Sequence, residues 1–311
     1  MRLDPFDYQA FREALKPARF TEEQKIELYA TFGGIPAYLD IAEAVAEKGY
    51  DAVISEAFLS KNGTLREEPQ RILNSELRET PRYWSILSAI ADGKETPKEI
   101  GDITHLSAPA LQSYARRLKD LLGIVALNEP VLGKKKSTRY LIADNLFRFW
   151  FRFIGKNATV MELENYDSVR KAIKNELPML ASIVFEDAVI EIIKKLNGKQ
   201  WNGMPINVEA LGQWWDRKGE QIDVCGHAGN VLLLGEVKWR NEQTDADIPR
   251  DLLRKKAYMT RGTKLEQYRP VLFVVSKTGF TEAAKRFMQE HAMHAFDLSD
   301  VTKAYDSLPP T

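Results

Sequence analysis

The segment that most restricts the fold is "VLLLGEVKW", residues 231–239. Its first four residues are apolar, which is typical of a strand that is buried on both faces. In an extended chain alternate side chains share a face, so Glu236 and Lys238 point the same way as Leu234. An acid and a base at the end of a buried strand cost free energy unless they are paired, hydrated or bound to a metal. The segment therefore predicts a core strand with a polar site at its end.

The segments around this strand predict an α/β domain over residues 178–305. They alternate between helical and strand-like patterns, in the order helix, three strands, helix, strand and helix. Their ranges are 180–196, 212–216, 220–226, 230–239, 248–260, 269–276 and 280–291. This is an αβββαβ order with a mixed sheet, followed by one more helix.

The first half of the chain predicts two smaller helical regions. Residues 1–79 are mostly helical in pattern; one helix starts at capping-box spacing, Thr21 to Gln24, and "GGIPAYL" (33–39) ends it. Residues 80–154 show three helical patterns followed by two strand-like runs, which is the order of a winged helix-turn-helix. Residues 155–177 are polar and predict a connector. The predicted fold class is therefore multidomain, α plus α/β.

A surplus of basic residues in the 80–154 region favours contacts with nucleic-acid phosphates. It gathers on the third predicted helix and the hairpin, where a DNA-binding winged helix places such contacts. The helix after the core strand adds two further arginines. The candidates are Arg116, Arg117, Lys119, Lys134, Lys135, Lys136, Arg139, Arg250 and Arg254. The alternative is that this module serves only in packing or protein contact.

Two carboxylates on neighbouring predicted strands indicate a metal site. If the strands pair as a hairpin, Asp223 lies beside Glu236, and a divalent cation would relieve the repulsion between them. Oxygen ligands suit Mg²⁺ or Mn²⁺. Glu186 is the acid on the apolar stripe of the preceding helix, so we expect it to face the sheet as a third candidate ligand.

On this order of elements, the pattern of Asp223, Glu236 and Lys238 resembles the PD-(D/E)xK nuclease superfamily, whose domain is restriction-endonuclease-like. The resemblance implies metal-assisted hydrolysis of phosphodiester bonds. Asp223, Glu236 and Glu186 would hold Mg²⁺ or Mn²⁺, with the Val237 carbonyl as a further ligand, and Lys238 would position the attacking water. The alternative is a buried ion pair in an inactive nuclease fold.

The whole chain also resembles the C-terminal part of archaeal-type ATPases that end in the "domain of unknown function 234". The longest stretches that carry the resemblance are "YATFGGIPAYL" (29–39), "LREEPQRIL" (65–73), "RYLIADNLFRFWFRF" (139–153) and "QWWDRKGEQIDV" (213–224). In that family a P-loop ATPase core precedes a helical lid, a winged helix and the nuclease-like domain. The chain has no GxxxxGK[ST] motif, so we expect no nucleotide cofactor in it.

Composition narrows the class of protein. The formal charge is zero, so nucleic-acid binding would rely on local patches rather than on a global field. The single cysteine, Cys225, excludes an intramolecular disulfide and fits a reducing compartment. No apolar run reaches the roughly 18 residues of a membrane span, and the N-terminus lacks the pattern of a secretory signal. We therefore expect a cytoplasmic protein with no membrane partner.

Three functions are consistent with these patterns. The first is a metal-dependent nuclease with a winged-helix platform for DNA. The second is a catalytically inactive DNA-binding or regulatory protein. The third is an interaction module that assembles with a separate ATPase subunit or as a homo-oligomer.

Overall fold

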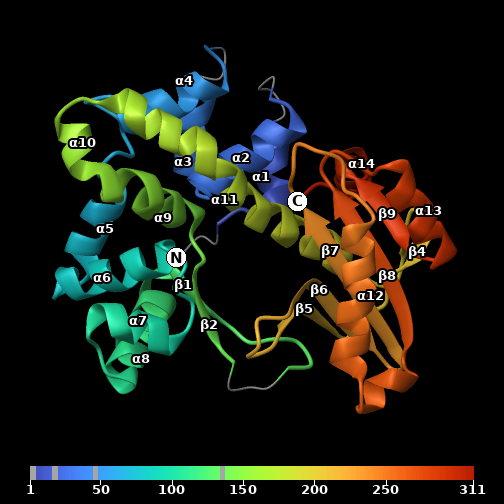
Figure 1. Ribbon diagram of the computed structural model, residues 1–311. Coiled ribbons are helices and arrows are strands. Elements are labelled where there is room, and N and C mark those ends of the chain that lie inside the picture. Colours follow the sequence, from blue (N-terminus) through green and yellow to red (C-terminus); the bar gives the residue numbers. More distant parts are fainter. Residues whose placement is uncertain (1–4, 16–19, 45–47, 134–136) are drawn as a thin grey trace. The chain divides into compact units, whose positions relative to one another are not determined.

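The chain forms two compact units, shown in a computed structural model (Figure 1). The structure describes residues 5–15, 20–44, 48–133 and 137–311. Unit 1 consists of Met1–Asn128 and Thr138–Leu180. Unit 2 consists of Glu129–Ser137 and Ala181–Thr311. Each unit has its own core and is described separately. In the part of the chain that is described, no helix is long and apolar enough to cross a membrane.

Unit 1 is mostly helical, as its sequence predicts. Its first helices are α1 (Tyr8–Ala14), α2 (Glu22–Phe32), α3 (Pro36–Ala44), α4 (Tyr50–Ile54) and α5 (Glu68–Glu76). A π-helical turn, Ser55–Leu59, continues α4. The expected capping box is present at the start of α2, where Thr21 and Gln24 bond reciprocally, and Gly33 ends the helix with a φ of 65°.

Three further helices and a two-stranded sheet follow in unit 1. They are α6 (Thr80–Ala91), α7 (Pro97–Thr104), α8 (Ala108–Arg117) with a π-helical turn (Leu118–Leu122), β1 (Val125–Asn128) and β2 (Arg139–Ile142). The strands pair antiparallel, with Val125 opposite Ile142. The order of elements is the predicted one; the assignment to a winged helix remains a prediction.

The aromatic run "LFRFWFRF" lies in the core of unit 1. It forms α9 (Asn145–Phe149) and a π-helical turn (Trp150–Ile154). The ring of Phe149 packs 4.8 Å from that of Phe58, and the ring of Trp150 packs 5.1 Å from that of Trp84. The run therefore joins the helices of residues 1–79 to those of residues 80–154.

The polar segment 155–177 is helical, which differs from the expected connector. It contains a short 3₁₀ turn (Gly155–Asn157), α10 (Ala158–Glu162) and the first part of α11 (Tyr166–Lys195). Pro178 lies inside α11, whose predicted range starts only at residue 180. The helix continues through it because Val169, Ile173 and Leu177 are buried at helical spacing. The division between the units falls within α11, after Leu180.

Unit 2 is built on a five-stranded mixed sheet. The strands are β5 (Ala210–Trp215), β6 (Gln221–Ala228), β7 (Val231–Lys238), β8 (Arg269–Ser276) and β9 (His294–Asp297). They lie in chain order; β5, β6 and β7 pair antiparallel, and β7, β8 and β9 pair parallel. The predicted mixed sheet is confirmed. The sequence did not predict the strand β9, the helix α14 (Leu298–Asp306) or a small hairpin of β3 (Gln200–Trp201) and β4 (Met204–Pro205).

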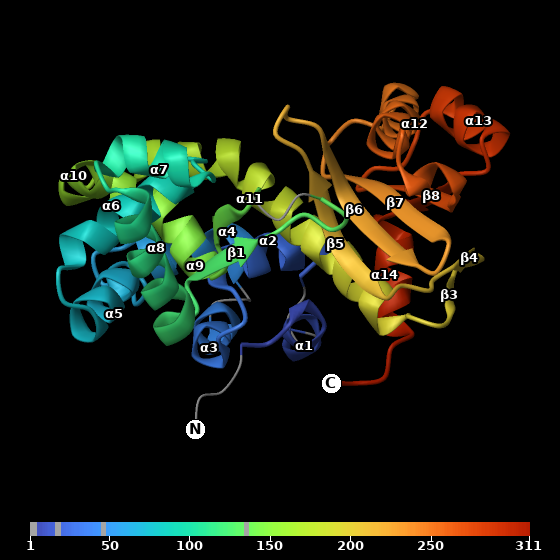
Figure 2. The same cartoon turned by 90° about the horizontal axis from the view of Figure 1, so that it is seen from below.

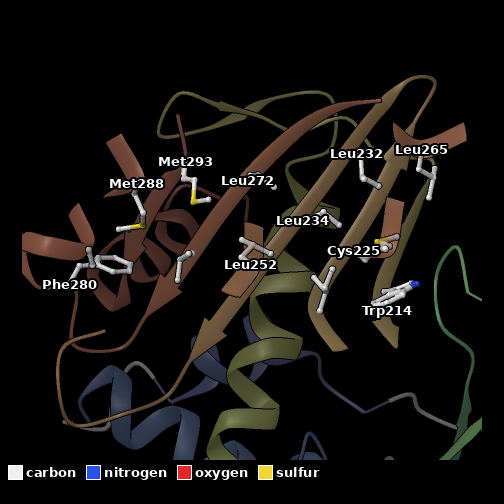
Figure 3. Packing of buried hydrophobic residues seen from close by; sticks show 14 residues of the cluster. Trp214, Cys225, Leu232, Leu234, Leu252, Leu265, Leu272, Phe280, Met288 and Met293 are labelled. Atoms are coloured by element: carbon white, nitrogen blue, oxygen red, sulfur yellow. The ribbon is translucent and has the colours of Figure 1, made fainter. Parts of the chain in front are cut away.

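Helices cover both faces of this sheet (Figure 2). One face carries α12 (Asp247–Thr260) and α13 (Glu282–Glu290); the other carries the end of α11 and α14 (Leu298–Asp306). A short 3₁₀ helix, Lys264–Gln267, precedes β8. Leu232 and Leu234 of β7 are fully buried against Leu252 of α12, in the core drawn in Figure 3. The same face of β7 carries Glu236 and Lys238.

The loop that joins β1 to β2 packs within unit 2. The Val131 N–H donates to the Gln213 carbonyl oxygen at 2.8 Å, and Trp215 Nε1 donates to the Ser137 carbonyl oxygen at 2.8 Å. The described ends of this loop therefore lie on β5. Lys134, Lys135 and Lys136 lie outside the described residues.

Candidate active site

The pairing of β6 with β7 sets the position of the two central carboxylates. Val224 lies opposite Gly235, so the next residues along, Asp223 and Glu236, are neighbours at the end of the pair. A Cβ on Gly235 would lie 2.2 Å from the ring of Phe273, so only glycine allows this ring to cross the strand. Asp223 is 6% exposed and Glu236 is 2% exposed. Two acids are therefore buried side by side on adjacent strands of the sheet.

Lys238 joins these two carboxylates. Its Nζ donates to Asp223 Oδ2 at 2.7 Å and to Glu236 Oε2 at 2.6 Å. Asp223 Oδ2 also accepts the Val237 backbone N–H at 3.0 Å. The structure thus brings together three of the four catalytic candidates, and it does so through charge-assisted hydrogen bonds in a buried setting.

A second lysine, whose position the sequence did not predict, also contacts Glu236. Lys255 of α12 donates from Nζ to Glu236 Oε1 at 2.9 Å and lies 3.1 Å from Asp251 Oδ2. A signal for it was present, because Lys255 follows the buried Leu252 by three residues and precedes the buried Met259 by four. We name the set Asp223, Glu236, Lys238, Lys255 and Asp251 the charged cluster.

The fourth candidate, Glu186, lies on α11, which covers the opposite face of the sheet from α12. Its Oε2 accepts a hydrogen bond from Gln213 Nε2 at 2.9 Å. Burial, followed by the negative charge of Asp223, raises the pKa of Glu186 well above its usual range. Glu186 is therefore near enough to Asp223 to sense its charge, and the surroundings favour its protonated form.

The ionisation of the cluster follows from burial and pairing. Burial alone would raise the pKa of Asp223, but the Lys238 ammonium and the Val237 N–H outweigh it and lower that pKa. Burial and the charge of Asp223 raise the pKa of Glu236. Burial disfavours a charged Lys238, yet the two carboxylates outweigh it and raise the lysine pKa. Asp223 and Lys238 are therefore ionised together at neutral pH.

The two central carboxylates supply oxygen atoms of the type that binds magnesium, but they are not arranged as a preformed metal site. Among the described residues, no group of three or more His, Cys, Asp or Glu side chains is arranged to hold a metal. Mg²⁺, however, is usually bound by one or two carboxylates, with waters and substrate phosphates completing its shell. Asp223 and Glu236 supply two such carboxylates. Each already accepts the Lys238 ammonium, so a metal would have to displace that lysine.

The predicted phosphate-binding residues fall into separate groups. Arg116, Arg117 and Lys119 are exposed at the end of α8 and in the π-helical turn that follows it. Arg139 forms an ion pair with Glu95 at 3.2 Å.

On α12, Arg254 binds Glu220 through two bonds of 2.8 and 2.7 Å, and it also binds Asp251 at 2.8 Å. The Arg250 guanidinium lies 5.2 Å from the centre of the Phe287 ring. Arg254 is thus held by two carboxylates of the protein. Arg250 is exposed and makes a cation–π contact.

Comparison with known proteins gives two similarities. Residues 150–248 match the model of a family, the domain of unknown function 234, described as "Archaea bacterial proteins of unknown function". The chain is 29% identical over 285 residues to "Uncharacterized protein MJECL04" of Methanocaldococcus jannaschii; the match covers 89% of this chain and 61% of that relative. The chain thus corresponds to less than two thirds of the length of the relative. No solved structure matches the chain.

Proposed function

We propose that unit 2 is a metal-dependent nuclease domain of the PD-(D/E)xK type that hydrolyses phosphodiester bonds in DNA. One observation carries the proposal: Lys238 Nζ lies within hydrogen-bond distance of carboxylates from two adjacent strand ends, 2.7 Å from Asp223 and 2.6 Å from Glu236. The order α11, β5, β6, β7, α12 and β8 supports the same fold type. An acid pair that can hold a metal, with a lysine beside it, suits metal-assisted phosphate chemistry.

Each residue of the site has a separate task in this proposal. Asp223 and Glu236 would hold Mg²⁺ or Mn²⁺, together with the Val237 carbonyl. The metal, when bound, polarises a phosphate oxygen and acidifies water. Lys238, displaced from the carboxylates, would orient a water molecule and stabilise the negative charge that develops on the phosphate.

The proposed reaction is a hydrolysis. The water oxygen forms a bond to phosphorus and gives up one proton to solvent, while the bond from phosphorus to the leaving sugar oxygen breaks and that oxygen takes up one proton from solvent. Glu186, whose Oε2 accepts the Gln213 side-chain N–H, would bind the metal directly or through a water molecule.

Unit 1 would serve as the DNA platform. Its helices α6, α7 and α8 with the strands β1 and β2 have the order of a winged helix, and Arg116, Arg117 and Lys119 lie exposed on it. Phosphate contacts from such residues give binding that weakens as salt rises. Retained affinity at high salt, or after Arg116→Ala and Arg117→Ala together, would count against this platform.

A second candidate function is a non-catalytic DNA-binding or regulatory protein. It is favoured by Lys255, which gives Glu236 a second ammonium partner and extends the chain of ion pairs to Asp251. In that case the cluster only stabilises the fold, and no metal displaces Lys238.

Cleavage assays separate the two candidates. Linear, nicked and branched DNA would be incubated with Mg²⁺ or Mn²⁺ and the wild type, Glu236→Ala or Lys238→Ala. We expect cleavage by the wild type and its loss in both variants. The matched control is Glu220→Gln, which removes an ion-paired carboxylate of the same unit outside the charged cluster. Cleavage that survives both substitutions contradicts the site, and no cleavage of any substrate favours the second candidate.

A further inference from the structure

A cavity in unit 1 is lined by residues from two sequence stretches that have no role in the proposed nuclease site. Its volume is about 460 Å³, within the usual range for small-molecule sites. Residues from "YATFGGIPAYL" (29–39) form one wall, and residues from "RYLIADNLFRFWFRF" (139–153) form another. The two stretches are separated by about a hundred residues in the chain, so the cavity exists only in the folded unit.

The glycine pair of the first stretch shapes one wall. A Cβ on Gly34 would lie 2.0 Å from the Phe6 carbonyl oxygen, and the Phe6 N–H donates to the Gly34 carbonyl oxygen at 2.8 Å. The Tyr29 hydroxyl donates to the Phe6 carbonyl oxygen at 2.9 Å. Glycine is therefore required at position 34 for the N-terminal segment to close against this loop.

The chemistry of the lining is asymmetric. Among the described residues that line the cavity, Asp144 is the only charged one, and the rest of the surface is largely apolar, from Ile35, Ile72, Leu122 and Phe147. Tyr38, also in the lining, donates its hydroxyl to Glu68 Oε1 at 3.4 Å, which brings a second carboxylate near. The cavity therefore combines a negative potential at one side with an apolar body.

The surroundings of Asp144 do not neutralise its charge. One carboxylate oxygen accepts the Phe147 N–H at 3.0 Å and so caps α9. Burial raises the pKa of Asp144, and the backbone N–H groups of Phe147 and Leu146 and the charge of Arg148 offset this only in part. A cation in the cavity would supply the compensation that the protein leaves incomplete.

We propose that this cavity binds a small organic cation, in which an amine or amidine group contacts the Asp144 carboxylate and a compact apolar body fills the space beside Ile35 and Phe147. This site is independent of the charged cluster in unit 2.

Binding of benzamidine to the full chain tests the proposal, with benzamide as the neutral analogue of the same shape. Isothermal titration calorimetry should show saturable binding of benzamidine and at least about tenfold weaker binding of benzamide, because a charge-assisted bond is lost. Asp144→Asn keeps an equally good helix cap and removes only the charge. It should weaken benzamidine binding by at least about tenfold as well.

Two further variants keep the test interpretable. Asp297→Asn changes another capping aspartate, at the start of α14, and should leave benzamidine binding unchanged. Ala143→Leu enlarges an exposed residue of the lining and should block binding while Asp144 stays charged. The proposal is overturned if benzamidine does not bind at millimolar concentration, if benzamide binds equally well, or if Asp144→Asn binds as the wild type does.

Discussion

Two aspartates, one in each unit, differ in how their negative charge is balanced and in the direction of their pKa shift. Asp223 in unit 2 accepts the Lys238 ammonium at 2.7 Å, and its pKa is lowered although burial opposes this. Asp144 in unit 1 accepts backbone N–H groups as a helix cap, and burial raises its pKa. The negative charge of Asp223 is balanced by a lysine of the same fold, whereas that of Asp144 is balanced only in part by backbone N–H groups and Arg148.

This difference has opposite consequences for ligand binding. A cation that enters the charged cluster must compete with Lys238, so a metal would bind only as that lysine moves away. A cation that enters the unit 1 cavity meets a carboxylate with its charge incompletely compensated, so it would bind without displacing a side chain.

The largest expected effect comes from Lys238→Met. It leaves Asp223 and Glu236 buried beside each other with one shared ammonium removed, which typically costs about 3–5 kcal/mol of unfolding free energy. Urea denaturation measures the loss. In the variant, Mg²⁺ should recover more stability than it gives the wild type, because the metal takes the place of the ammonium.

The control for this change is Arg254→Met, which breaks ion pairs with Glu220 and Asp251 on a half-exposed side chain. Exposed pairs contribute up to about 1 kcal/mol, so this variant should lose little. Equal losses of unfolding free energy in the two variants would mean that the buried cluster stabilises the fold no more than an exposed ion pair does.

A smaller loss is expected for Lys255→Met. Glu236 keeps Lys238 as a partner, so the variant removes one charge-assisted bond to Glu236 and one contact with Asp251. A loss of about 1.5–3 kcal/mol is expected in the same urea titration. If Lys255→Met costs more than Lys238→Met, the second lysine rather than the first holds the carboxylates together.

Opposite pH dependences should distinguish the two aspartates. If the pKa of an acid is raised in the folded protein, the free energy of unfolding falls as pH rises from the unfolded pKa of about 3.9 towards the folded pKa. If the pKa of an acid is lowered in the folded protein, the free energy of unfolding falls as pH drops from the unfolded pKa through the folded pKa.

Thermal unfolding at a series of pH values would measure this. Asp144→Asn should gain stability relative to the wild type as pH rises from about 4 to 7. Asp223→Asn should lose stability relative to the wild type as pH rises through the lowered folded pKa of Asp223 to about 4, and the deficit should then stay constant up to pH 7. Differences of the same sign for both variants would contradict the comparison.

The smallest expected effect is that of Glu186→Gln. Because the folded pKa of Glu186 is raised, ionising it above that pKa destabilises the fold, and glutamine avoids this while it can still accept the bond from Gln213. The variant should unfold at a higher temperature than the wild type at pH 8, and the gap should close at pH 4. A variant less stable than the wild type at pH 8 would show that the carboxylate is needed in its charged form.

The sequence predicts most of unit 2 because its patterns are local. The apolar run at 231–234 and the β-rich run at 269–276 are strands, and alternation along β7 placed Glu236 and Lys238 on one face. Capping chemistry predicted the start of α2 for the same reason. The positions of Asp223 and Glu236 followed from one assumption, that their strands form a hairpin.

What the sequence did not predict depends on contacts between distant residues. The bond from Val131 to Gln213 joins segments about eighty residues apart, and no local pattern shows that the β1–β2 loop packs on β5. The contact of Lys255 with Glu236 depends on how α12 crosses the sheet. The N-terminal extension of α11 was not predicted, because the polar composition of residues 155–177 favoured a connector over a helix with a buried stripe.

The most direct test of the central claim is the rate at which the purified chain cleaves a labelled DNA substrate under single-turnover conditions with Mg²⁺. The claim is that Asp223, Glu236 and Lys238 form a metal-dependent site. It predicts cleavage by the wild type, loss of cleavage on chelation of the metal with recovery on its return, and a fall of about a hundredfold or more in Lys238→Met. Glu220→Gln should cleave at the wild-type rate. A wild-type rate that is unchanged by chelation, or a Lys238→Met rate equal to that of the wild type, would contradict the claim.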